Sequence, residues 1–120
     1  MSLGFISRWA LAIVLNTIVL LLARFLIPGF TLTGTWIQIL TIALVLTFLN
    51  FLVKPILRFF LAPLIILTLG IGLILINMLI FYLLDIYFAN LSIQGIPAYF
   101  YAAVLAGVFN LAFHFIIKKS

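Results

Sequence analysis

Residues 15–34 read LNTIVLLLARFLIPGFTLTG, and residues 76–95 read INMLIFYLLDIYFANLSIQG. The two stretches match at an offset of 61 residues, and each one runs from an apolar segment into a short polar loop. The aligned pairs are Asn16 with Asn77, Arg24 with Asp85, Gly34 with Gly95 and, after a slip of one residue, Asn50 with Asn110. This pattern predicts a tandem duplication of a two-helix hairpin, with one repeat over about 3–60 and the other over about 61–120.

Composition assigns both repeats to a membrane. The chain has 120 residues, of which 69% are hydrophobic and only 6% are charged, whereas soluble domains carry about 25% charged residues. The apolar runs are long and unbroken, which favours helices over the short alternating segments of a transmembrane barrel. We therefore predict an all-α integral membrane protein that forms a single domain over residues 1–120.

Four apolar runs predict four transmembrane helices. The expected spans cover roughly residues 5–27, 35–53, 64–88 and 98–117. Lys54-Pro55 is expected to end the second span, because the residue before a proline disfavours helix. Residues 55–62 are then expected to form a short interfacial helix.

The two polar loops carry a strand signal. Residues 30–34 and 91–95 alternate apolar and polar side chains ahead of a glycine, which is typical of short strands. We predict that both segments are extended, lie on the outer side of the membrane and pair with each other.

The basic residues predict the orientation. With four spans, the termini and the middle connector share one side, whose positive residues are Arg8, Lys54, Arg58, Lys118 and Lys119. The opposite side carries only Arg24 and Asp85, whose charges cancel. Because cytoplasmic loops are enriched in Lys and Arg, both termini are expected in the cytoplasm. The expected partners of the basic residues are anionic lipid headgroups, and no nucleic-acid partner is needed.

The sequence offers little catalytic chemistry. There is no cysteine, and His114 and Asp85 are the only histidine and the only acid. On the predicted topology these two residues lie at opposite faces of a hydrocarbon core about 30 Å thick, so they cannot form an acid–base pair. We expect no enzyme activity, no catalytic residues, no cofactor and no metal.

Several intramembrane residues allow both a structural and a functional interpretation. Arg24 and Asp85 are candidates for an outer ion pair, and Asp85 is alternatively a proton or cation site. The asparagines Asn16, Asn77, Asn50 and Asn110 are candidates for hydrogen bonds between helices, or for the polar lining of an oligomeric pore. Small residues at Ala98, Ala102, Ala103, Ala106 and Gly107 predict a close helix-packing face, within the chain or between copies.

Particular motifs resemble a known family. These are Asn50-Phe-Leu-Val-Lys54-Pro55, then Pro63-Leu-Ile-Ile-Leu-Thr68-Leu-Gly70 and Ile76-Asn77, preceded by Pro28-Gly-Phe30-Thr-Leu32-Thr-Gly34. Together they resemble the four-transmembrane bacterial phage holin superfamily IV over about residues 3–117. The resemblance implies a small multi-pass protein of the bacterial cytoplasmic (inner) membrane.

Two functions remain open at this point. As the resemblance implies, the chain would form oligomeric pores or lesions in the cytoplasmic membrane. Alternatively, it would be a non-enzymatic scaffold or accessory protein that acts in envelope integrity through helix–helix and lipid contacts. The near absence of ionisable groups from the spans favours the second function, and small size with several spans fits the first.

Overall fold

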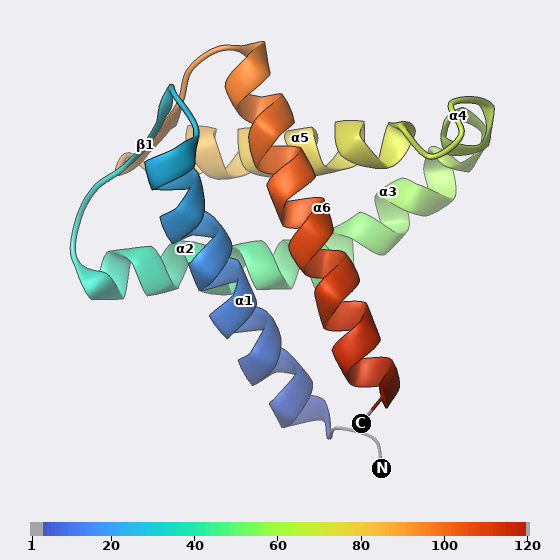
Figure 1. Cartoon of the computed structure of the whole chain (residues 1–120), viewed down its shortest axis with the longest axis horizontal. Coiled ribbons are helices and arrows are strands. Elements are labelled where there is room, and N and C mark those ends of the chain that lie inside the picture. The colour runs from blue at the N-terminus through green and yellow to red at the C-terminus, as the bar shows by residue number, and fades with distance from the viewer. Residues whose placement is uncertain (1–3, 120) are drawn as a thin grey trace.

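The computed structural model describes residues 4–119 as a helical protein with one small two-stranded sheet (Figure 1). Its elements are α1 (Phe5–Leu26), β1 (Phe30–Leu32), α2 (Trp36–Phe48), the π-helix η1 (Leu49–Val53), α3 (Lys54–Phe60), α4 (Ala62–Leu67), α5 (Gly72–Tyr87), β2 (Leu91–Ile93) and α6 (Ile96–Lys119).

The helices form two crossed layers. In Figure 1, α1 and α6 descend side by side across α2 and α5, with both chain ends at the bottom of the view. The strands lie where α1 and α5 end and α2 and α6 begin, far from the chain ends and from α3 and α4. We call the region of the two strands the strand end. The opposite region, which holds the start of α1, the end of α6, and α3 and α4, is the terminal end. Between them, the main helix contacts are those of α1 with α2 and α6, and of α5 with α6.

The predicted strand pairing is confirmed. β1 and β2 are antiparallel, with Phe30 opposite Ile93 and Leu32 opposite Leu91. All four side chains are buried in the core, and the Phe30 ring packs edge-on against Phe81 of α5. The sheet therefore links the two hairpins and covers the core at the strand end.

The predicted end of the second span at Lys54-Pro55 is wrong. The helix continues from α2 through η1 into α3, and the backbone N–H of Lys54 bonds to the carbonyl of Leu49, five residues back. In a regular helix the ring of Pro55 would clash with the carbonyl four residues earlier and remove a hydrogen bond. The wider π turn accommodates the proline without ending the helix, so α3 extends the second helix rather than forming a separate interfacial one.

The expected start of the third span at residue 64 is also wrong. α4 ends at Leu67, and α5 begins only at Gly72. Leu69 and Gly70 have positive φ values of 56° and 94°, and the N–H of Gly70 bonds back to the carbonyl of Ile65. This is the hydrogen bonding of a Schellman helix end. The chain therefore turns between α4 and α5 instead of forming one long helix.

Three helices of the described chain are long and apolar enough to cross a membrane: Phe5–Leu26, Trp36–Phe60 and Ile96–Lys118. The fourth apolar helix, α5, has 16 residues and spans about 24 Å at ~1.5 Å per residue. This is shorter than a hydrocarbon core of about 30 Å.

Candidate functional site

The first intramembrane asparagine joins α1 to α2. The amide of Asn16 donates a hydrogen bond of 2.8 Å to the hydroxyl of Thr47, which in turn donates to the backbone carbonyl of Ala43. Asn16 and Thr47 are both buried. Because a buried amide without a partner costs free energy, this chain of bonds stabilises the contact between the two helices.

The second asparagine joins α5 to α6 at a site of small residues. The amide of Asn77 donates to the backbone carbonyl of Ala103 at 3.2 Å. A Cβ placed on Gly107 would lie 3.6 Å from the Asn77 nitrogen, which is an ordinary van der Waals distance, so Gly107 packs close to the asparagine. Along this face of α6, Ala98, Ala102, Ala103 and Ala106 are buried. The small side chains let the backbone of α6 approach its neighbours closely.

Equivalent positions of the two sequence stretches make equivalent bonds at the strand end. The N–H of Thr33 donates to the carbonyl of Asn90, and the N–H of Gln94 donates to the carbonyl of Gly29. Gln94 follows Thr33 by 61 residues, and Asn90 follows Gly29 by 61. The donors of the two bonds are therefore equivalent at the offset that aligns the sequences, and so are the acceptors.

A polar cleft lies on the terminal-end side of these bonds, between η1, α3, α5 and α6. Two adjoining cavities of ≈ 160 Å³ and ≈ 290 Å³ share several of their lining residues. The polar residues of this cleft are Asn50, Lys54, Arg58, Asn77, Asn110 and His114. Three of the four candidate intramembrane asparagines therefore line one space, together with two basic residues and the only histidine.

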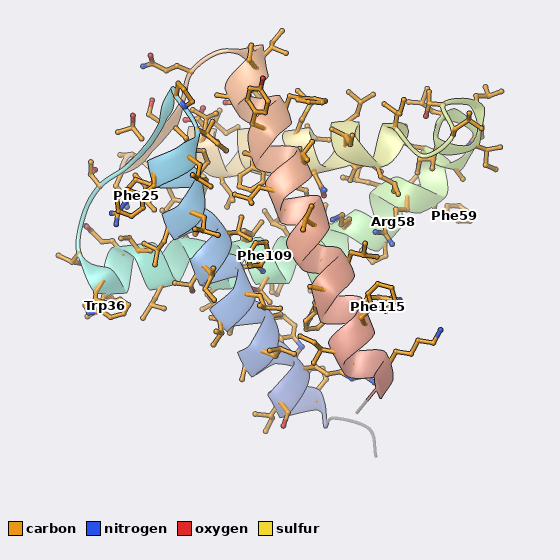
Figure 2. All side chains as sticks on the ribbon, in the orientation of Figure 1. Phe25, Trp36, Arg58, Phe59, Phe109 and Phe115 are labelled. Atoms are coloured by element: carbon orange, nitrogen blue, oxygen red, sulfur yellow. The ribbon has the colours of Figure 1, made fainter. Side chains whose placement is uncertain are left out.

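Lys54 is the least exposed basic residue of the cleft. Only 5% of its surface is exposed, and among the residues that the structure describes its ammonium makes no hydrogen bond or salt bridge. Arg58 lies one turn further along α3 and is exposed. Figure 2 shows it on the side of α3 nearest α6, with Phe59 pointing away. The two positive groups thus line the same cavities, and no carboxylate side chain of the described residues lines them as well.

The sequence contains a signal for this cleft. Asn50, Lys54 and Arg58 recur every four residues, and so do Asn110, His114 and Lys118, at an offset of 60. Residues four apart lie on one face of a helix, so each series forms a polar stripe. The expected helix end at Lys54-Pro55 hid the first stripe, because it placed Lys54 and Arg58 on different elements.

The structure does not bring Arg24 and Asp85 together. Both lie in the last turns of their helices at the strand end, but they make no salt bridge within the described chain. The Asp85 carboxylate accepts a hydrogen bond from the hydroxyl of Tyr99, and the guanidinium of Arg24 lies 5.5 Å from the Phe25 ring centroid. α1 packs mainly on α2 and α6, which gives the two charges different neighbours.

Arg8 and Lys118, two of the remaining basic residues of the prediction, do not line the cleft. Both are exposed, and the side chain of Lys119 lies outside the described part.

Asp85 and His114 lie far apart. Asp85 bonds to Tyr99 near the start of α6, and His114 lies 15 residues further along that helix, about 22 Å at ~1.5 Å per residue. In residues 4–119 no three His, Cys, Asp or Glu side chains form a metal-binding group.

A family model gives the placement of the chain among known proteins. Searches of curated proteins and of solved structures find no match. The family model described as "Mycobacterial 4 TMS phage holin, superfamily IV" matches residues 7–112, which includes both hairpins, the sheet and most of the cleft. The chain therefore belongs to the superfamily IV family of four-transmembrane-segment phage holins.

Proposed function

We propose that this protein crosses the bacterial cytoplasmic membrane four times, with both termini in the cytoplasm, and that it arose by duplication of a helical hairpin. The basic residues of the terminal end support this orientation. The short α5 would complete its crossing by local thinning of the bilayer, which accommodates a short span. The matching hydrogen bonds of the two hairpins support the duplication.

Within that membrane, the proposed role is that of a non-enzymatic scaffold or accessory protein that acts through lipid and helix contacts. The observation that carries this proposal is the distribution of polarity. Asn16, Thr47 and Asn77 are buried and bonded inside the chain. The outward faces are apolar, with exposed residues that include Val14, Ile18, Leu40, Leu44, Leu75, Leu79, Val104 and Val108.

Such outward faces suit lipid or another apolar helix, and they do not supply the wall of a water-filled pore. The exposed hydroxyl of Thr41 bonds to the carbonyl of Ile37 in its own helix, as polar groups in lipid must. Association of copies through these faces would bury apolar surface.

A second candidate function is holin-like pore formation by several copies. Family membership favours it, and so does the polar cleft, which already opens between α3 and α6 and would line a passage if copies joined around it. Asn50 and Asn110 would then face water.

Dye release from vesicles distinguishes the two functions. The purified protein is reconstituted into vesicles of bacterial lipids that enclose a small fluorescent dye, over a series of protein-to-lipid ratios. The scaffold function predicts that release stays at the level of protein-free vesicles at every ratio. Release that rises steeply with the protein-to-lipid ratio would contradict it and assign the pore function.

A further inference from the structure

We infer that the polar cleft between α3, α5 and α6 binds a phosphate group, carried by a lipid headgroup or free in solution. The inference deepens the proposed function by naming a ligand class, and it rests on the proposed membrane location. It starts from the two adjoining cavities, which Lys54, Arg58, Asn110 and His114 all line.

The described residues supply no anion to pair with the positive charges of the cleft. Lys54 is 5% exposed and has no acceptor among the described residues. The only acidic side chain of the sequence is Asp85, which lies at the strand end and bonds to Tyr99. A buried charge is costly unless it is paired. An anion in the cavity would pair with both Lys54 and Arg58.

The donors of the cleft fit the oxygens of a phosphate. Lysine binds phosphate as a compact point charge, and arginine presents a planar fork of N–H groups that matches two phosphate oxygens. The amides of Asn50 and Asn110 line the same cavity, and within residues 4–119 neither makes a hydrogen bond to another side chain. Amide N–H groups of this kind donate readily to phosphate oxygens, and His114 adds a further donor.

The cleft is also open to a lipid. Its apolar walls include Leu73 of α5 and Leu111 of α6, and Leu111 is exposed. Arg58 and His114 are exposed at the mouth. A headgroup phosphate can therefore reach Lys54 while its acyl chains lie along apolar surface.

Thermal unfolding in a neutral detergent tests the inference. Fluorescence of the two tryptophans reports the Tm during titration with dioctanoyl phosphatidic acid, with inorganic phosphate, or with dioctanoylglycerol, which has the same acyl chains and no phosphate, all at constant ionic strength. The test variants are Arg58→Gln and Lys54→Met, and the matched control is Arg8→Gln, which removes an exposed positive charge outside the cleft.

The inference predicts that phosphatidic acid, inorganic phosphate or both raise the Tm of the wild type and of Arg8→Gln. Arg58→Gln weakens this response at least about tenfold in apparent Kd, as expected for a lost charge-assisted hydrogen bond. Because Arg58 is exposed, this variant remains informative even where Lys54→Met does not fold. A response to phosphatidic acid alone identifies a headgroup as the source, and an equal response to inorganic phosphate identifies the free ion.

Two results would overturn the inference: equal responses of Arg58→Gln and Arg8→Gln, or a response to dioctanoylglycerol as large as that to phosphatidic acid. Neither result bears on dye release from vesicles, so the scaffold proposal and the phosphate site fail separately.

Discussion

The side-chain amide of Asn16 donates a hydrogen bond of 2.8 Å to the hydroxyl of Thr47 and thereby joins α1 to α2 inside the protein. We predict that Asn16→Leu and Thr47→Val each lower the free energy of unfolding. The double variant should lose less than the sum, by about 0.6 kcal/mol and at most about 1.7 kcal/mol, which are the average and the maximum for hydrogen bonds between membrane helices. Unfolding of the purified variants by titration with sodium dodecyl sulfate measures this coupling.

Thr41→Val is the matched control for Thr47→Val. The hydroxyl of Thr41 is exposed and bonds only to the carbonyl of Ile37 in the same helix, so its loss should change the unfolding free energy little and should add independently to Asn16→Leu. Strictly additive losses for Asn16→Leu and Thr47→Val would show that their bond contributes nothing to stability.

Asp85 is predicted to be coupled to Tyr99 rather than to Arg24. Tyr99→Phe removes the hydroxyl that donates to the Asp85 carboxylate and should cost roughly 1.5–3 kcal/mol, as for a hydrogen bond to a charged group. In double-mutant cycles, Tyr99→Phe with Asp85→Asn should be non-additive, whereas Arg24→Gln with Asp85→Asn should be nearly additive. A larger coupling of Asp85 to Arg24 than to Tyr99 would support the ion pair instead.

Gly34 and Gly95 are predicted to tolerate alanine poorly. Their φ values are 100° and 93°, and a side chain held in such a conformation costs on the order of 1–3 kcal/mol. Gly34→Ala should cost more than Gly95→Ala, because its Cβ would collide with Oε1 of Gln38, which accepts the backbone N–H of Thr35 at 2.8 Å in the capping box of α2.

Gly4→Ala provides the control for both glycines. No atom lies within 4 Å of its added Cβ, and its φ is −70°, so thermal unfolding should show no loss of stability. If Gly34→Ala were as stable as Gly4→Ala, the turn at Gly34 would not be under the steric constraint described above.

The sequence predicted the parts of the fold that depend on local pattern. The apolar runs located α1 and α6 to within about two residues, and alternation around Thr31 and Ser92 predicted strands that the structure pairs with those two residues opposite each other. The buried asparagines Asn16 and Asn77 were identified because unpaired amides are costly in an apolar interior.

The parts that the sequence did not predict depend on backbone geometry that overrides residue preference. A proline such as Pro55 normally marks a helix end, but the π turn of η1 accommodates it within a continuous helix. Leu69 adopts a positive φ, which leucine rarely does, so the break before α5 had only Gly70 and Gly72 as a signal. The cleft depends on both features, because its residues come together when α3 continues α2 and α5 begins only at Gly72.

The central claim is that the strand end and the terminal end lie on opposite sides of the membrane, so that even the short α5 crosses it. The chain has no cysteine, so single cysteines can be introduced at exposed positions: Gln94→Cys beside β2, Leu69→Cys before α5 and Lys118→Cys near the end of α6. Labelling of intact cells with a membrane-impermeant maleimide should modify Gln94→Cys alone, and the other two only after permeabilisation. Labelling of Gln94→Cys and Leu69→Cys from the same side would contradict the account.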